Sequence, residues 1–319
     1  MFNKLNPLPL VFVNFGPIPK HLKANIDYIG ATFPERRKIL IGNIDKPSWL
    51  AELDFEYVEA NSLITDWPAQ FITKGSQRFF RDDFWFTTKA RLLLLPKLMR
   101  KNGLEQLLHL ENDVWIHSKF PFTFFEAAQT PIAFPRVDSE RGIASTLFIN
   151  REEGIRILER ACIDWPTLTD MQILGKILNS NPKEIELRST SNLKSASPGE
   201  WLFDGAKLGM YLFGSDPRNS KGIIKRFAYS PMKSLESGQK IVIESDFLLL
   251  QTAKGSNPIA SLHIHSKDIS IFRVEWKWSV SRQLIKAKLR IHFGFSWNGF
   301  WISLIEFVVR AVRKLCSLI

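Results

Sequence analysis

The chain has 319 residues and a mass of 36.8 kDa, with 45% hydrophobic and 24% charged residues. This composition excludes a disordered or fibrous protein and fits one large α/β domain or two modest ones. The net charge is +11, but residues 271–319 hold nine Lys and Arg against two Glu and contribute +7 of it, which leaves +4 for the other 270 residues. Because the excess charge lies in the tail, the sequence does not indicate a nucleic-acid-binding surface across the protein.

The predicted secondary structure alternates between apolar strands and amphipathic helices. In chain order, the expected strands are 9–15, 38–42, 107–110 and 144–149, and the expected helices are 20–29, 82–101, 151–160, 169–178 and 205–213. Gly16-Pro17 predicts a turn after the first strand, and residues 179–200, rich in Ser, Asn, Lys and Pro, predict a mobile loop. The alternation favours an α/β fold with a mostly parallel central sheet flanked by helices, which binds ligands beyond the carboxyl ends of its strands.

Common catalytic motifs and cysteine sites are absent from the sequence. No two glycines are separated by a single residue, which excludes the G-x-G-x-x-G dinucleotide fingerprint, and no P-loop, H-E-x-x-H or G-x-S-x-G motif occurs. Cys162 and Cys316 lie too far apart in the sequence to indicate a disulfide framework or a zinc site. Residues 1–20 lack the pattern of a secretion signal, so we expect a cytoplasmic protein.

Two acidic residues follow the strand expected at 107–110. Glu111 and Asp113 are two positions apart, so in an extended segment both carboxylates would lie on one face, with Asn112 on the other. Their hard oxygen ligands suit Mg²⁺ or Mn²⁺, which can bridge diphosphate oxygens and neutralise a departing nucleotide diphosphate. An isolated E-x-D is weak evidence, because most such acids are simply solvated. Its position directly after a buried strand favours a metal site.

A second polar cluster occupies residues 262–267, Leu-His-Ile-His-Ser-Lys. Strand alternation would place His263 and His265 on one face, where one imidazole could complete the metal site. Lys267 could then contact a phosphate as a point charge. The alternative interpretation is two half-buried histidines on an amphipathic strand.

Together these segments resemble bacterial GT-A glycosyltransferases and glycosyltransferase-like proteins of polysaccharide and glycan assembly. The matching stretches are 108–114, 203–206 with 214–219, and 262–267, within a resemblance that spans about residues 8–270. In that family an acidic D-x-D or E-x-D motif closes a central strand, and a histidine near the end of the domain supplies a further metal ligand. The resemblance therefore implies Asp113 as a metal ligand, Glu111 in place of the usual first Asp, and a larger role for His265 than for His263.

The resemblance also implies a fold and an activity. Residues 1–270 would form a GT-A-like, Rossmann-like catalytic domain. With Mn²⁺ or Mg²⁺, this domain would transfer a sugar from a nucleotide-diphosphate donor to a glycan, polysaccharide or lipid-linked acceptor. Two alternatives remain open, namely a catalytically degenerate binding or scaffold protein of the same fold and, less favoured, a basic nucleic-acid-binding protein.

Further donor-site and catalytic residues follow from the same resemblance. Arg91, about twenty residues before the acidic motif, would contact the nucleotide or its phosphates, unless it is a solvated helix arginine. Asn14 and Phe15, at the end of the first strand, occupy the place where such folds hold the base and ribose, although Phe15 could equally belong to the core. For an inverting transfer a carboxylate accepts the acceptor's hydroxyl proton. Asp204 and Asp170 are the candidates, each of which could instead cap a helix, and a retaining mechanism stays open.

The tail, residues 271–319, predicts a helical extension. From Phe300 onward, apolar residues recur at three- and four-residue steps opposite a polar face. Trp297, Trp301 and the basic residues upstream give the segment the composition of an interfacial anchor. Two hypotheses remain: the tail docks the protein peripherally on the anionic inner face of the membrane, or it packs on its own domain or in an oligomer.

Overall fold

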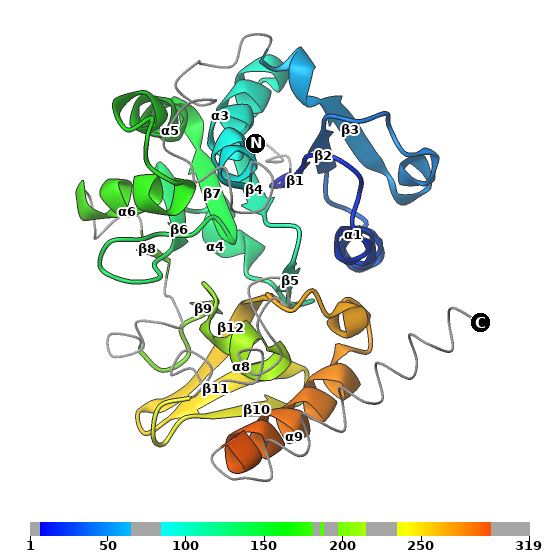
Figure 1. Cartoon of the computed structure of the whole chain (residues 1–319), viewed down its shortest axis with the longest axis vertical. Coiled ribbons are helices and arrows are strands. Elements are labelled where there is room, and N and C mark those ends of the chain that lie inside the picture. Colours follow the sequence, from blue (N-terminus) through cyan, green and yellow to red (C-terminus); the bar gives the residue numbers. More distant parts are fainter. Residues whose placement is uncertain (1–6, 65–83, 181–185, 188–196, 215–234, 295–319) are drawn as a thin grey trace, which may run out of the picture.

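The computed structural model describes residues 7–64, 84–180, 186–187, 197–214 and 235–294 (Figure 1). Within these ranges the helices and strands form two sheets with helices packed on them. Three expectations lie outside the described residues: most of the loop at 179–200, the turn at 214–219 beyond Gly214, and the amphipathic helix from Phe300.

The larger sheet has seven strands in the order β3-β2-β1-β4-β7-β6-β8. They are β1 (Leu10–Asn14), β2 (Lys38–Gly42), β3 (Phe55–Glu59), β4 (Gln106–Leu110), β6 (Ile132–Pro135), β7 (Thr146–Asn150) and β8 (Glu186–Leu187). Four of the six neighbouring pairs are parallel, and only β7 runs antiparallel to its two neighbours. The mostly parallel central sheet expected from the sequence is confirmed.

Helices cover both faces of this sheet. Successive residues of a strand point to opposite faces, and the central strands carry buried apolar residues on both. Leu10 and Phe12 of β1 pack with α1 in one core cluster, whereas Val11 packs with α3, α5 and α6 in another. The covering helices are α1 (Lys20–Thr32), α3 (Phe84–Asn102), α4 (Phe122–Glu126), α5 (Arg151–Asp164) and α6 (Asp170–Ser180). Two short 3₁₀ helices, η1 (Ser48–Leu53) and η2 (Ala60–Ser62), flank β3. The result is a three-layer α/β/α arrangement.

A smaller sheet, which the sequence did not predict apart from the histidine strand, follows the order β10-β11-β12-β5. Its strands are β5 (Val114–Ile116), β10 (Lys240–Glu244), β11 (Phe247–Thr252) and β12 (Gly255–His263), and β9 (Leu202–Phe203) pairs with β12. β5 follows β4 after three residues, so the acidic motif joins the two sheets, near the middle of the view in Figure 1. β12 ends at His263, so the expected extended conformation does not continue to Lys267.

Two helices pack on the smaller sheet, α8 (Lys207–Phe213) and α9 (Trp276–Gly294), with a short 3₁₀ helix, η7 (Ile269–Ile271), before α9. Trp276, Val280 and Ala287 of α9 are buried in the same core cluster as β12. The first turns of the predicted extension are therefore packed on the smaller sheet, and the division of the chain at residue 270 stays a prediction. None of the helices in the described ranges is both long and apolar enough to cross a bilayer.

Candidate metal and donor site

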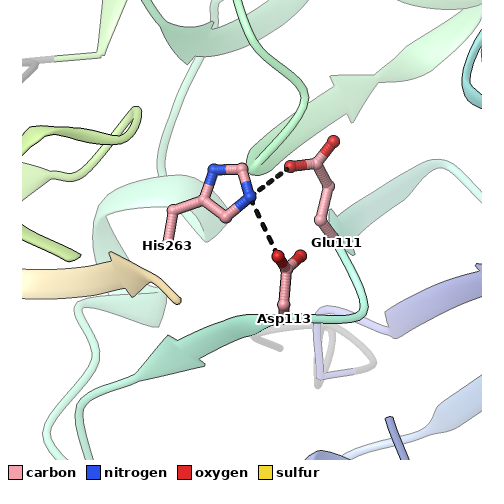
Figure 2. A group of neighbouring side chains, drawn as sticks. All are labelled: Glu111, Asp113 and His263. Carbon is pink, nitrogen blue, oxygen red and sulfur yellow. Dashed lines mark ion pairs between the residues drawn. The ribbon is translucent and has the colours of Figure 1, made fainter. Parts of the chain in front are cut away.

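The acidic motif forms a turn between the two sheets. The Val114 N–H donates to the Glu111 carbonyl at 3.0 Å, so residues 111–114 are not extended, and the strand geometry expected for the motif is wrong. The carboxylates still meet, because both approach one imidazole nitrogen (Figure 2). His263 Nε2 lies 3.2 Å from Glu111 Oε2 and 3.3 Å from Asp113 Oδ2.

Strand pairing brings His263 to this turn from the other end of the chain. β12 runs antiparallel to β5 with His263 opposite Val114, and the Ile264 N–H donates to the Asp113 carbonyl at 2.8 Å. The His263 Nδ1–H donates to the Gly205 carbonyl at 2.8 Å. This hydrogen bond fixes the tautomer that directs the other nitrogen, Nε2, at the carboxylates, as carbonyl partners do for metal-binding histidines.

His263, rather than His265, is the histidine that the structure groups with the carboxylates. Ligand atoms of Glu111, Asp113 and His263 all lie within 4.8 Å of one another, and His265 is not in this group. The His265 ring instead stacks on His263, with centroids 4.0 Å apart. The charge of His265 also acts on Asp113, and the larger role expected for His265 from the resemblance stays a prediction.

The ligand-atom spacing fits a six-coordinate divalent cation. In such a site, with bonds of about 2.1 Å, neighbouring ligand atoms lie about 3 Å apart. The two separations from His263 Nε2, 3.2 and 3.3 Å, are close to that value. Glu111 Oε2 is also buried and accepts no hydrogen bond. One nitrogen and two carboxylate oxygens form a donor set that suits Mn²⁺ or Mg²⁺.

Charges within the cluster shift its ionisation. Burial would lower the pKa of His263, but the carboxylates of Asp113 and Glu111 outweigh burial and raise that pKa to about 9. Burial would raise the pKa of Asp113, but the charges of Lys267 and His263 hold it well below its usual range. The Asp113 carboxylate therefore stays ionised and requires positive charge close by.

Lys267 supplies part of that positive charge. Its Nζ makes direct contact with Asp113 Oδ2, although the sequence predicted a phosphate contact. Lys267 also has φ of +59°, in the left-handed region that side-chain-bearing residues rarely adopt. Backbone strain of this kind concentrates at functional sites.

Arg91 links two carboxylates instead of lying in solvent. From α3, its guanidinium pairs with Glu111 Oε1 and with Asp170 Oδ2, each at 2.5 Å. Burial would lower the pKa of Arg91, but Glu111 and Asp170 raise it, so the guanidinium remains charged. Because Arg91 holds Oε1 of Glu111, Oε2 is the oxygen turned to His263. The structure therefore brings Arg91 to the cluster through Glu111.

Asp170 lies behind Arg91 and is almost fully buried, with 1% of its surface exposed. It is the first residue of α6, but the cap of that helix is Thr169, whose Oγ1 accepts the Gln172 N–H at 3.3 Å. The Asp170 side chain is thus directed to Arg91, and the capping role considered for it is filled by Thr169.

Asp204 is completely buried and is bound to backbone. Its Oδ1 accepts the Leu208 N–H at 3.0 Å, and its Oδ2 accepts the N–H groups of Gly209 at 2.7 Å and His263 at 3.2 Å. The carboxylate therefore caps the start of α8 and ties that helix to the strand that carries His263.

The end of β1 lies beside the motif. Asn112 Nδ2 donates to Asn14 Oδ1 at 3.1 Å, and Asn14 in turn donates to the Gly16 carbonyl. Gly16 adopts φ of +76°, and the chain bends at Gly16-Pro17, where the sequence predicted a turn after the first strand. Phe15 is partly buried against the α3–α5–α6 core cluster, so part of its ring serves packing.

Sequence reasoning missed Asn25, which holds the acidic turn from α1. Its side-chain amide is fully buried and donates to the Val114 carbonyl at 2.9 Å and to the Asn112 carbonyl at 3.3 Å. A polar residue on the apolar face of a predicted helix was the available signal. Without the fold, nothing in the sequence connects it to a turn 87 residues away.

Several solved structures with a similar backbone arrangement are glycosyltransferases. The galactosyltransferase LgtC, in complex with donor and acceptor sugar analogs, aligns over 88% of this chain and 95% of its own, with 12% identity and a TM-score of 0.45. An active-site mutant of LgtC gives the same coverage and identity with a TM-score of 0.48. GlyE of Streptococcus pneumoniae aligns over 58% of this chain and 46% of its own, with 16% identity and a TM-score of 0.38.

At these values the likeness concerns the course of the backbone and carries no residue role to this chain. No family profile and no curated protein sequence matches the chain.

Proposed function

We propose that the protein is a metal-dependent glycosyltransferase of the GT-A type that uses a nucleotide-diphosphate sugar. The observation that carries this proposal is the group of Glu111, Asp113 and His263, built at the carboxyl end of β4 beside the end of β1. In open α/β sheets, ligands bind beyond the carboxyl ends of the strands. An E-x-D motif with a histidine at that place suits a metal–diphosphate donor.

We propose the following roles for the residues of the site. Asp113, Glu111 and His263 would hold Mn²⁺ or Mg²⁺, which supplies positive charge for the diphosphate as it leaves. Lys267 would transfer from Asp113 to a donor phosphate, and Asn14 with Phe15 would contact the nucleoside. Arg91 fixes the Glu111 carboxylate, and through it supports the donor site.

Asp204 and Asp170, the candidates for a catalytic base, are better suited to positioning. Both are buried, Asp204 accepts three backbone N–H groups and Asp170 pairs with Arg91. We therefore assign Asp204 to holding His263, and Asp170 to holding Arg91. The acceptor would be a glycan, a polysaccharide or a lipid-linked sugar, and whether transfer inverts or retains configuration stays open.

One observation favours a second function, a catalytically degenerate protein that binds a ligand. The Lys267 ammonium contacts Asp113, and in a degenerate fold such a contact would permanently replace the cation. The two functions differ in whether the protein binds Mn²⁺, because an ammonium fixed on Asp113 would prevent binding of Mn²⁺ at that carboxylate.

The test combines metal binding with donor turnover. Calorimetry with Mn²⁺, a thermal-shift screen of nucleotide sugars with Mn²⁺, and donor hydrolysis would be measured for the wild type and for Asp113→Asn. We expect the variant to lose Mn²⁺ binding and turnover while it stays folded, because its carboxylate carries charge for an ion and adds little packing. Asp246→Asn is the matched control, since this carboxylate also contacts lysines but is exposed and away from the site.

The histidines provide an internal comparison. His263→Ala should weaken Mn²⁺ binding more than His265→Ala, because His263 Nε2 lies within 3.3 Å of an oxygen of each carboxylate. Unchanged Mn²⁺ affinity in Asp113→Asn would refute the metal site. Absence of Mn²⁺ binding by the wild type would favour the degenerate protein.

A further inference from the structure

Helix α9 has one face in the protein core and an opposite face in solvent. Trp276, Val280 and Ala287 are buried, whereas Trp278 and Ile285 are 65% and 63% exposed. Trp278 and Ile285 are seven residues apart, so they lie on one side of the helix, two turns from each other. Large apolar side chains this exposed, paired on one helix face, indicate an interaction surface.

Basic residues share this face. Arg282 lies between the two apolar side chains, with its guanidinium carbon 5.5 Å from the Trp278 ring centroid, and Lys286 follows it. Both are exposed, and among the described residues neither has an acidic partner. Lys277, by contrast, pairs with Asp246 at 2.6 Å. The face therefore combines apolar side chains with positive charge that is not neutralised.

We propose that this face, formed by Trp278, Arg282, Ile285 and Lys286, docks the protein on an anionic lipid surface. Tryptophan and aliphatic side chains insert at the boundary of headgroups and acyl chains, and basic residues beside them contact anionic headgroups. Positive charge that alternates with apolar groups on one face matches such a surface better than an uncharged protein partner. Val274, just before the helix, is also 66% exposed.

The docking face is connected to the candidate site. Gln283, on the buried side of α9, donates to Asp268 Oδ2 at 3.1 Å, and Ser279 Oγ donates to the Ser270 carbonyl. Asp268 directly follows Lys267, which contacts Asp113. Docking through α9 would thus hold the site segment at a fixed distance from the lipid surface. The proposal itself rests on α9 alone and holds whether or not the metal site is catalytic.

The experiment uses the full chain, because removal of α9 would expose the core residues Trp276, Val280 and Ala287. The protein would be sedimented with two kinds of vesicle, one of phosphatidylcholine alone and one that also contains about 30% phosphatidylserine. Two double variants test the face: Trp278→Ser with Ile285→Ser, and Arg282→Glu with Lys286→Glu. The matched control is Arg160→Glu with Ile163→Ser on α5, whose side chains are similarly exposed.

We expect the wild type and the α5 control to bind the anionic vesicles and to release them at high salt. Each basic residue near the surface contributes about fivefold in partitioning, so the double charge reversal should weaken binding at least about 25-fold. The Trp278 and Ile285 variant should lose at least about tenfold. The proposal would be overturned if both α9 variants sedimented with anionic vesicles as the wild type does. It would also be overturned if the wild type bound neutral and anionic vesicles equally. A dimer that dissociates in the Trp278 and Ile285 variant, without vesicle binding by the wild type, would overturn it in favour of a second copy.

Discussion

Replacement of Asp204 by Asn separates a structural role of this carboxylate from a catalytic one. The side chain is completely buried and accepts three backbone N–H groups, from Leu208, Gly209 and His263. Asparagine has nearly the same shape but offers one acceptor oxygen in place of two. If that oxygen replaces Oδ2, it can still accept from Gly209 and His263, but the Leu208 N–H then faces an NH₂ group.

The expected loss of stability follows from these bonds. A hydrogen bond to a charged group contributes about 1.5–3 kcal/mol, and one to a neutral group about 1 kcal/mol. Loss of the Leu208 bond would cost about 2 kcal/mol, and weakening of the other two about 1 kcal/mol each. We therefore expect Asp204→Asn to lower the free energy of unfolding by about 4 kcal/mol. A catalytic base would show the reverse pattern, with little loss of stability and a rate lowered about 10²–10⁴-fold.

Urea unfolding followed by tryptophan fluorescence, together with Mn²⁺ calorimetry, measures both effects. We expect a lower unfolding midpoint and weaker Mn²⁺ binding, because His263 loses part of its support. Asp27→Asn is the control, since its carboxylate is exposed on α1 and pairs with the equally exposed Lys23 of the same helix; it should change stability by less than about 0.5 kcal/mol. An Asp204→Asn variant with wild-type unfolding and metal affinity but no turnover would refute the structural role.

Two further predictions concern charge. Burial lowers the pKa of His117 to about 4, whereas an unfolded histidine titrates near 6.5, so its contribution to stability is complete above about pH 6.5 and is lost as the pH falls toward 4. Between pH 7 and 5 the loss should be about 2 kcal/mol, and urea unfolding of His117→Asn should lack this part of the pH dependence. Lys267→Met should raise Mn²⁺ affinity at least about fivefold, because an ammonium no longer competes for Asp113, and should weaken binding of a nucleotide diphosphate. Equal affinities of wild type and Lys267→Met for both ligands would contradict a shared role of that side chain.

The sequence predicted the elements with strong periodicity. The apolar runs of β1, β2, β4 and β7 and the helices α1, α3, α5 and α6 are present, although α1, α5 and α6 end two to four residues later than predicted. The acidic motif was found because its position after a buried strand is visible in one short stretch. The conformation of the motif was not predicted, because the turn depends on a hydrogen bond from the Val114 N–H to the Glu111 carbonyl that residue spacing does not reveal.

The smaller sheet shows the limit of periodicity. β5 and β9 have three and two residues, too few for any pattern, and β10 and β11 form a hairpin with mixed burial. The pairing of Arg91 with Asp170 could not be predicted for a different reason. Both were singled out as charged residues of helices, but their pairing depends on how α3 and α6 pack, which local sequence does not specify.

The position of His263 depends on Gly209, a residue that has no side chain to bind a ligand. Gly209 of α8 lies so close to β12 that a Cβ there would stand 1.9 Å from the His263 carbonyl oxygen, so only glycine allows the helix to pack against that strand. From this close position Gly209 donates to Asp204, which in turn accepts the His263 N–H, while the preceding Gly205 carbonyl accepts the His263 Nδ1–H. The backbone around α8 thus sets the position and the tautomer of His263. A motif of two histidines at alternate positions contains no trace of this support, which is why the sequence left the metal ligand undecided and the structure favours His263.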